Sequence, residues 1–380
     1  MTPIYFDYNA TTPLDLGVRQ AMDPYLQGFW GNPSSIHSIG RHARAALDEA
    51  RYRMASAWAC RPSEVVFTGG GTESNNLAIL GTARLLKSKG RHLVTSRIEH
   101  HAVLHAFQYL QQNEGFDVTF LPVDSNGRLD VGQVLSSLRS DTVLVSVMAA
   151  NNEVGTLQPV AEIGSLCRER GVLFHCDAVQ AFGKVSFRDI HQFEADLVSV
   201  CAHKFHGPRG TGALFIRSPL LPHPIQHGGA QENERRGGTE NIAAIVGLVE
   251  AFERCVVQPA FPEASLREWT TWLADRLVQI SGVVIRGDSS KRLSNTLSFT
   301  VLGTDSIALL ANLDLEGVCA SSGSACTAGS VEPSHVLKAM GVPDSEANAL
   351  IRFSLGRENN FDQVRHVAEI VADSVKRIRR

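Results

Sequence analysis

The sequence predicts an α/β fold, in which a mainly parallel seven-stranded sheet lies between helices and is joined to a smaller α+β part. Between about residues 65 and 217, short apolar runs alternate with amphipathic segments, which is typical of parallel strands covered on both faces. From about residue 240 the alternation stops, and helices precede a second group of strands. The chain has 380 residues, of which 43% are hydrophobic and 20% charged, so we expect a globular protein with more than one core.

The expected elements follow in chain order. Residues 1–14 are expected to be irregular, and apolar residues at helical spacing predict helices over 16–27 and 38–59. The strands of the sheet are expected at 65–68, 92–96, 118–122, 143–148, 172–176, 197–201 and 212–217, with helices at 73–87, 102–113, 131–139 and 160–170. The second part has helices near 240–256 and 264–280, strands at 283–287, 294–301 and 317–321, and a final helix from about residue 361. Because Pro259 and Pro262 interrupt the pattern, we expect a large domain over 15–257 and a small domain made of 1–14 and 258–380.

Composition argues against several classes of function. The net charge is −3 and the chain has no long run of Lys or Arg, so neither nucleic acid nor a membrane surface is an expected partner. The first residues do not resemble a signal peptide, and no apolar run approaches the roughly 20 residues that span a bilayer, so we expect a cytoplasmic protein. Seven cysteines at irregular spacing, with no Cys-x-x-Cys, favour free thiols and predict no structural metal site.

Lys204 and Asp177 are the residues that point to a chemistry. Lys204 follows the apolar run 196–201 at the mouth of an expected strand, where poor solvation lowers the pKa of an amine and suits Schiff-base chemistry with an aldehyde cofactor. Asp177 ends another apolar run, and a carboxylate that pairs with a pyridinium nitrogen is the usual companion of such a lysine in pyridoxal phosphate (PLP) enzymes. Taken alone, Lys204 is better explained as a surface lysine in a turn than as a catalytic residue. Lys204 and Asp177 together, however, predict a PLP enzyme.

A glycine-rich turn, Gly69-Gly70-Gly71-Thr72, joins the strand at 65–68 to the next helix. Glycines let the backbone approach a ligand closely, and a helix start offers N–H groups to an anion. The turn matches neither the Walker loop nor the dinucleotide-binding fingerprint. It is therefore either a plain tight turn or, given Lys204 and Asp177, the site of the PLP phosphate.

His100 and Asn152 each follow an expected strand, where ligand groups gather in open parallel sheets. His100 either lies against a cofactor ring and moves protons or only caps the next helix. A zinc pair made of His101 and His105 is a further alternative, but no Glu or Cys completes such a set. Asn152 either joins the site or is a turn residue.

Cys326 lies in a segment of small residues, and Arg352 interrupts an apolar strand. Nine of the twelve residues from Cys319 to Ser330 are Gly, Ala or Ser, which predicts a mobile loop and, at Cys326, a reactive thiol rather than a packing cysteine. Arg352 either binds a substrate carboxylate through its guanidinium group or forms a structural ion pair. Arg236 lies in a glycine-rich polar loop that could reach a phosphate.

In this order, and over nearly the whole chain, these segments resemble the cysteine desulfurases of the NifS/IscS type, which are class V, fold-type I PLP enzymes. The loop around Cys326 is the most specific element, because it is similar to the long-loop group of these enzymes. The matching segments are 7–13, 31–35, 72–77, 99–100, 151–155, 177–180, 203–204, 321–327 and 352–357.

The resemblance implies a role for each candidate residue. Lys204 would hold PLP covalently, Asp177 would pair with the pyridine nitrogen, Gln180 would bind the ring hydroxyl, and His100 would stack on the ring. The phosphate would be bound by Gly71, Thr72, His203 and, from the second subunit of a homodimer, Thr239. Asn152, which also borders the cofactor, and Arg352 would hold the substrate carboxylate. Cys326 would attack the sulfur of L-cysteine, giving L-alanine and a persulfide that a sulfur-acceptor protein would take up, such as an iron–sulfur scaffold or a thiolation enzyme.

Other functions stay open at this point. A class V aminotransferase has no need for a loop cysteine, a selenocysteine lyase is not excluded, and an inactive sulfur-relay scaffold would not need Lys204 and His100. The sequence does not identify the sulfur acceptor, nor whether Cys326 also ligates an iron–sulfur cluster. One departure from the family is Cys201, which stands where such enzymes usually carry Ser and is a weaker hydrogen-bond donor.

Overall fold

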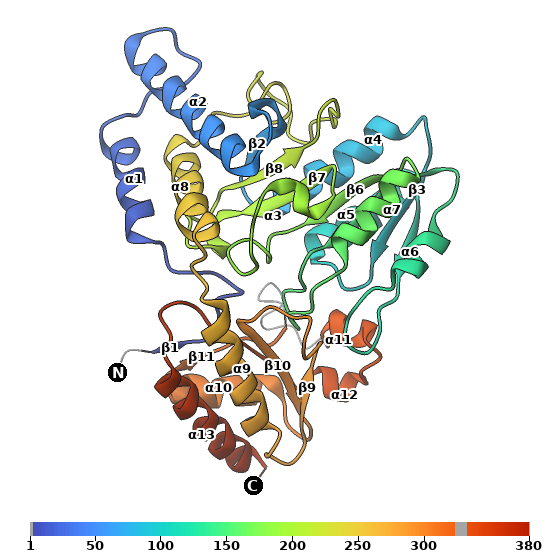
Figure 1. The fold of residues 1–380 in the computed structure, drawn as a ribbon, viewed down its shortest axis with the longest axis vertical. Coiled ribbons are helices and arrows are strands. Elements are labelled where there is room, and N and C mark those ends of the chain that lie inside the picture. Colours follow the sequence, from blue (N-terminus) through green and yellow to red (C-terminus); the bar gives the residue numbers. More distant parts are fainter. Residues whose placement is uncertain (1–2, 324–332, 380) are drawn as a thin grey trace.

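The computed structural model describes residues 3–323 and 333–379, and its main element is a seven-stranded sheet (Figure 1). Strand β8 runs antiparallel to both of its neighbours, and every other pairing in this sheet is parallel. The mainly parallel sheet predicted from the apolar runs is therefore confirmed. In spatial order the strands are β2 (Val65–Thr68), β8 (Gly212–Ile216), β7 (Leu197–Cys201), β6 (Leu173–Asp177), β5 (Thr142–Met148), β3 (His92–Ser96) and β4 (Asp117–Leu121).

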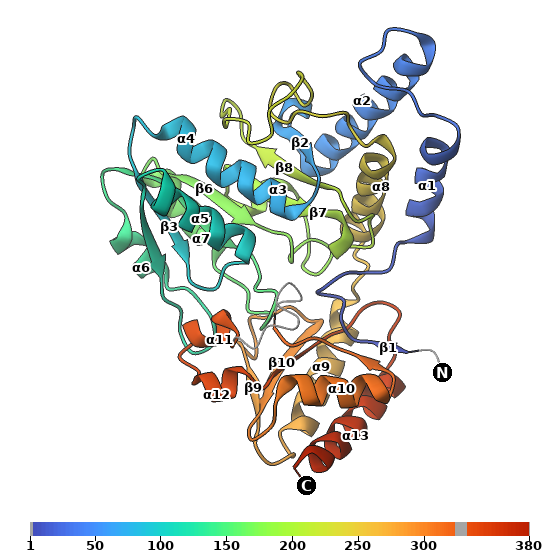
Figure 2. The same ribbon diagram turned by 180° about the vertical axis from the view of Figure 1, so that it is seen from behind.

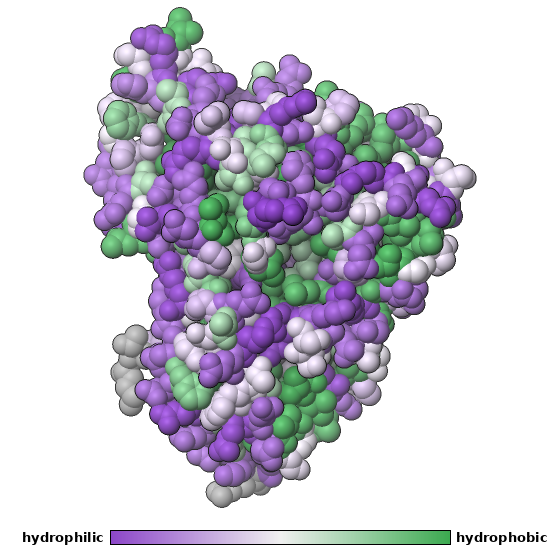
Figure 3. All heavy atoms as spheres, in the orientation of Figure 1, coloured by the Kyte–Doolittle hydropathy of each residue, from purple (hydrophilic) through white to green (hydrophobic). Residues whose placement is uncertain are grey.

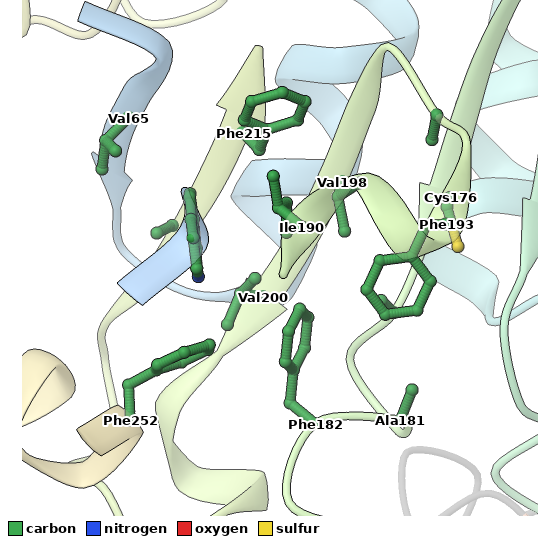
Figure 4. Packing of buried hydrophobic residues seen from close by; sticks show 14 of the residues in the cluster. Val65, Cys176, Ala181, Phe182, Ile190, Phe193, Val198, Val200, Phe215 and Phe252 are labelled. Carbon is green, nitrogen blue, oxygen red and sulfur yellow. The ribbon is translucent and has the colours of Figure 1, made fainter. Parts of the chain in front are cut away.

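Helices cover both faces of this sheet, because neighbouring strand residues enter two different apolar clusters. Phe67 belongs to the cluster on one face and Val66 to the cluster on the other. The first cluster includes residues of α1 (Leu16–Gln27), α2 (Ser38–Trp58), α6 (Val131–Ser137), α7 (Val160–Glu169) and α8 (Ile242–Phe252). The second includes residues of α4 (Thr82–Leu86) and α5 (His101–Asn113). Figure 4 shows aromatic rings of the first cluster, among them Phe182, Phe215 and Phe252, packed around the strand that carries Val198 and Val200.

A second, smaller part lies beside the carboxyl-end edge of the large sheet (Figure 2). It contains an antiparallel sheet of β12 (Leu350–Ser354), β10 (Thr296–Val301) and β9 (Val283–Arg286) and a parallel pair of β1 (Ile4–Tyr5) with β11 (Val318–Cys319). Its separate core, which includes Phe6, Phe299 and Leu313, supports the proposed division into 15–257 and 1–14 with 258–380. Its helices are α9 (Glu263–Leu277), α10 (Ser306–Leu315), α11 (His335–Ala339), α12 (Asp344–Ala347) and α13 (Phe361–Ile378).

Several elements differ from the expectation, mostly where they are short. Residues 1–14 contain the strand β1, and the strand expected at 317–321 is reduced to the two residues of β11. Helices α11 and α12 are too short to show a periodic pattern. The helix expected at 73–87 begins as α3 (Gly71–Asn76) and passes through a π-helical turn at 77–81 before α4, and a second π-helical turn at 253–257 follows α8.

The surface seen in Figure 3 is mostly hydrophilic, with smaller apolar areas between the polar side chains. None of the helices in the described part of the chain has both the length and the apolar composition that crossing a bilayer requires.

The small core gives a matched test of packing within one helix. Leu313 of α10 is fully buried, whereas Leu315, two residues further on, is 83% exposed. Leu313→Ala should lower the free energy of unfolding by about 2–5 kcal/mol, because it leaves a cavity, and Leu315→Ala should change it by less than about 0.5 kcal/mol. Urea unfolding followed by tryptophan fluorescence measures both, and equal effects of the two substitutions would contradict this packing.

Candidate active site

A cavity of about 210 Å³ lies where β5, β6 and β7 end, next to the start of α3. Its lining contains every site residue predicted from the sequence except Thr239 and Cys326. Thr239 is exposed on its own chain, and Cys326 lies outside the described residues. The lining residues are Asn9, Ala10, Gly71, Thr72, Asn75, His100, Met148, Ala150, Asn152, Asp177, Val179, Gln180, Cys201, His203, Lys204 and Arg352.

Lys204 enters the cavity from a single 3₁₀ turn, Ala202–Lys204, that directly follows β7. Its Nζ donates hydrogen bonds to the backbone carbonyls of Asn9 and Ala10, at 2.8 Å each. The amine is therefore held by the N-terminal segment, which the sequence alone did not connect with Lys204. This arrangement differs from a surface lysine in a turn, because the amine lines a cavity.

Asp177, the last residue of β6, presents a buried carboxyl group to the same cavity. Burial raises the pKa of this carboxyl group, while hydrogen bonds from the Val179 N–H and Asn75 and the charge of Lys204 act in the opposite direction. The Nδ2 group of Asn75 donates to Oδ2 at 2.7 Å, and the Val179 N–H donates to Oδ1 at 3.0 Å. A cationic ligand group beside this carboxyl would be stabilised by it.

His100 caps the next helix, one of the two sequence alternatives, and its position in the cavity lining leaves the role beside a cofactor ring as a prediction. It caps helix α5, because its Nδ1 accepts a hydrogen bond from the Ala102 N–H at 3.1 Å, and it also lines the cavity. Burial, followed by the nearby charge of Lys204, lowers its pKa to about 4. The imidazole is therefore neutral at pH 7, and because Nδ1 accepts, its proton is on Nε2.

The glycine turn before α3 forms one end of the cavity. A Cβ atom on Gly71 would lie 2.9 Å from Cγ2 of Val179 and 3.3 Å from Cβ of Cys201, so only glycine fits without a shift. Cys201 is 5% exposed, and its Sγ lies 3.9 Å from the Thr211 carbonyl. Burial raises the pKa of the Cys201 thiol, and the backbone N–H groups of Gly71 and His203 oppose that shift.

Arg352 is 1% exposed and is paired within the protein. Its Nη2 contacts Oδ1 of Asp7 at 2.7 Å, and its Nη1 donates to the carbonyls of Asn152 and Gly323 at 2.9 and 2.8 Å. The structural ion pair, one of the two sequence alternatives, is therefore present. Arg352 also lines the cavity, so its role toward a substrate carboxylate stays a prediction.

Other sequence alternatives have simple outcomes in the structure. The rings of His101 and His105 lie 5.0 Å apart between centroids, but no set of three metal-ligating side chains occurs within residues 3–323 and 333–379. Arg236 forms an ion pair with Glu73, at 2.8 Å between Nε and Oε1.

Sequence reasoning missed four polar residues that shape the site, namely Asp7, Asn9, Asn75 and Lys184. Asn75 lies one turn after the glycine segment, within the family-like segment 72–77, and Lys184 lies four residues after Gln180, so these positions beside predicted site residues were the available signal. Asp7 and Asn9 lie far from the site in sequence, within a segment expected to be irregular.

This architecture, with a lysine, an aspartate and a histidine at one end of a mainly parallel sheet, is that of a fold-type I PLP enzyme. The family model described as aminotransferase class-V matches residues 4–367, and the chain belongs to this family. Within it, the chain belongs to the cysteine desulfurases of the NifS/IscS type, as the following similarities show.

The chain is 47% identical to a putative cysteine desulfurase IscS 1 of Bacillus subtilis, over 100% of both chains. It is 43% identical to a cysteine desulfurase IscS of Dictyoglomus turgidum, over 99% of this chain and 95% of that relative. A solved structure of a NifS-like protein superposes with a TM-score of 0.92 at 35% identity, covering 99% of this chain and 100% of the other. A structure described as SspA in complex with cysteine has a TM-score of 0.82 at 36% identity, covering 94% and 100%.

The lowered pKa values of four buried or partly buried histidines determine how the stability of the fold should depend on pH. Burial lowers the pKa of His100 and His206 to about 4 and of His175 and His203 to about 3. Below about pH 6.5 the unfolded chain binds protons at these histidines while the folded chain does not, so the free energy of unfolding should fall as the pH decreases from about 6.5 to 4.

The contribution of one histidine can be isolated with His175→Gln. His175 is fully buried between the hydroxyl groups of Ser146 and Ser199. Below pH 6, the free energy of unfolding of the variant should depend on pH less steeply than that of the wild type, by about 1.4 kcal/mol per pH unit. Urea unfolding between pH 7 and pH 5 measures this slope, and identical slopes for variant and wild type would contradict the assignment.

Proposed function

We propose that the protein is a PLP-dependent cysteine desulfurase that converts L-cysteine into L-alanine and forms a persulfide on Cys326. The observation that carries this proposal is the cavity that brings together the amine of Lys204, the carboxyl group of Asp177 and the imidazole of His100. Membership of the NifS/IscS-type desulfurases supports the same reaction.

Three features of the cavity fit PLP. The buried carboxyl group of Asp177 has a raised pKa, and a protonated ring nitrogen would supply the positive charge that it lacks. Among the described residues, Oδ1 of Asn75, which lines the cavity, is buried without a hydrogen-bond partner. At the glycine turn, Gly71 and Thr72 border the cavity at the start of α3, where backbone N–H groups can meet an anionic group.

The site residues predicted from the sequence then receive proposed roles toward the cofactor. Lys204 would hold PLP covalently, with Asp177 at the ring nitrogen, Gln180 at the ring hydroxyl and His100 against the ring. The phosphate would be bound by Gly71, Thr72 and His203. Thr239 would reach the phosphate from the second subunit of a homodimer, and its exposure on its own chain, away from its own cavity, supports this arrangement.

When bound, PLP supplies an electron sink for the negative charge that develops at the substrate carbon next to the amine. The chain's own residues then bind the substrate and move protons. Lys204 is positioned by two carbonyl groups at 2.8 Å, and its Nζ would move the proton of that carbon. The pKa of His100 is lowered to about 4, so its ring is neutral at pH 7, and because Nδ1 caps α5 the ring proton is on Nε2.

Substrate binding and sulfur transfer complete the proposal. Asn152 and Arg352 would hold the substrate carboxylate. The Cys326 thiolate would attack the sulfur of L-cysteine, so that an S–S bond forms, the C–S bond breaks, and the substrate carbon takes up a proton to give L-alanine. The persulfide sulfur would then pass to an acceptor protein, such as an iron–sulfur scaffold or a thiolation enzyme, in the cytoplasm.

The most direct test of this reaction is Cys326→Ala. The variant should bind PLP and develop the yellow colour of the wild type, yet release alanine more slowly by several orders of magnitude, because the only nucleophile of the sulfur-transfer step is lost. Alanine release from L-cysteine, with mass spectrometry of the persulfide, measures the effect.

Two variants serve as controls for that test. Cys60→Ala removes another free, partly exposed thiol and should retain wild-type turnover. Lys204→Ala should lose turnover altogether. Wild-type alanine release by Cys326→Ala would show that the thiol of another residue receives the sulfur.

Cys201→Ser tests the departure from the family. Cys201 borders the cavity beside Gly71 and His203, so its thiol would stand where a hydroxyl group would donate to the phosphate. Because a hydroxyl is the stronger donor, we expect Cys201→Ser to bind PLP more tightly, by about a factor of ten or less, with kcat nearly unchanged.

The competing role of Cys201 is that of a second sulfur carrier. Its burial and the raised pKa of its thiol argue against that role, since the thiolate is the reactive form. Mapping persulfides by mass spectrometry after one turnover decides between the two, and sulfur on Cys201 of the wild type would contradict our assignment.

A further inference from the structure

Lys184 is a buried lysine for which the proposed reaction has no role. Its side chain is 3% exposed and lies in the loop after β6, four residues beyond Gln180. Its Nζ donates hydrogen bonds to Oε1 of Gln180 at 2.5 Å and to Oδ1 of Asn9 at 2.9 Å, and the ring centroid of Phe261 is 5.7 Å away. Because burying an amine is unfavourable unless it is well paired, these two acceptors are the reason it can stay there.

The surroundings of Lys184 disfavour its charged form. Burial lowers the pKa of the amine well below its usual value, the charges of Lys204 and Arg352 lower it further, and Asp7 acts in the opposite direction. The two acceptors, Oε1 of Gln180 and Oδ1 of Asn9, each receive one N–H of this amine.

The two neighbours of Gln180 fix the orientation of its side-chain amide. A backbone carbonyl can only accept, so the group that lies 3.0 Å from the Asn9 carbonyl is Nε2, and Oε1 is on the other side. A buried amide oxygen needs a donor, and Lys184 supplies it. The amide is thus held so that Gln180 presents N–H groups, rather than an oxygen, on the side of Asn9.

This orientation determines what Gln180 offers to a ligand, because Gln180 lines the cavity. One N–H of its Nε2 donates to the Asn9 carbonyl, which leaves the second N–H for an acceptor on the ligand. The same Asn9 carbonyl accepts from Nζ of Lys204 at 2.8 Å. Nζ of Lys184 thus donates to the side chain of Gln180, which is proposed to bind the ring oxygen. It also donates to the side chain of Asn9, the residue whose backbone carbonyl holds Lys204.

We propose that Lys184 is a positioning residue that locks the amide of Gln180 as a hydrogen-bond donor toward the ring oxygen of PLP. This inference rests on the proposed function, since it assigns the partner of a residue that PLP would contact. Lys184 itself touches neither the cofactor nor the substrate in this assignment and acts through Gln180.

The test is a double-mutant cycle on the colour of the PLP-bound protein. Lys184→Met removes the donor at similar volume, and Gln180→Met removes the amide; the double variant combines them. A ring oxygen that loses a donor holds its proton more tightly, so the pH midpoint of the visible absorbance change should rise by about one unit in each single variant. The double variant should shift no further, because Lys184 acts only through Gln180.

Several outcomes would overturn this inference. If the pH midpoint shifts in Gln180→Met but stays unchanged in Lys184→Met, Lys184 has a structural role only. That conclusion holds even if Lys184→Met lowers the melting temperature of the PLP-free protein. Additive shifts in the double variant would show that Lys184 acts independently of Gln180. If Lys184→Met does not fold, Lys184→Leu carries the same expected shift. Lys184→Gln, which retains an N–H donor, should return the midpoint toward that of the wild type.

The result also separates this inference from the proposed function. Wild-type protein that develops no visible band with added PLP would overturn both. A wild-type band whose midpoint is the same in Lys184→Met overturns the role of Lys184 alone.

Discussion

The hydrogen bonds of Asn9 are the interaction on which the site depends. Its backbone carbonyl accepts from Nζ of Lys204 and from Nε2 of Gln180, which belong to the segments after β7 and β6. Its side chain donates to Oγ1 of Thr296 at 2.9 Å, and its N–H donates to Oγ of Ser354 at 2.9 Å, so the same residue is bound to β10 and β12. An N-terminal residue thus joins the edge of the large sheet to the small sheet, and the position of Lys204 depends on both.

Burial controls the charges around this point. The carboxyl group of Glu99 is fully buried, and burial raises its pKa to about 8, so it is neutral at pH 7. His100 and His203 are also neutral, because burial lowers the pKa of both. The ionisable groups of the cavity lining that remain for a ligand are those of Lys204, Asp177 and Arg352. Electrostatic interactions are stronger at buried groups than in bulk water.

The sequence predicted the parts of the site that follow apolar runs. Asp177 ends a buried strand and Lys204 directly follows another, and both were predicted because parallel strands bring their carboxyl ends to one edge. The glycine turn was found because three successive glycines precede a helix. Contacts between distant segments were not predictable: Arg352 pairs with Asp7, 345 positions away, and periodicity carries no signal for such a pair. Lys184 was missed because a lysine in a loop is ordinarily exposed, and only its folded neighbours show that it is buried.

The central proposal is that Lys204, and not Lys184, the buried lysine nearby, is the residue that carries PLP. Borohydride reduction of the PLP-bound protein fixes the cofactor to the amine that it occupies, and peptide mass spectrometry then identifies that residue. Our account predicts the label on Lys204, whose amine lines the cavity, and none on Lys184, whose amine is bound to Gln180 and Asn9. A label on Lys184, or on neither lysine, would contradict it.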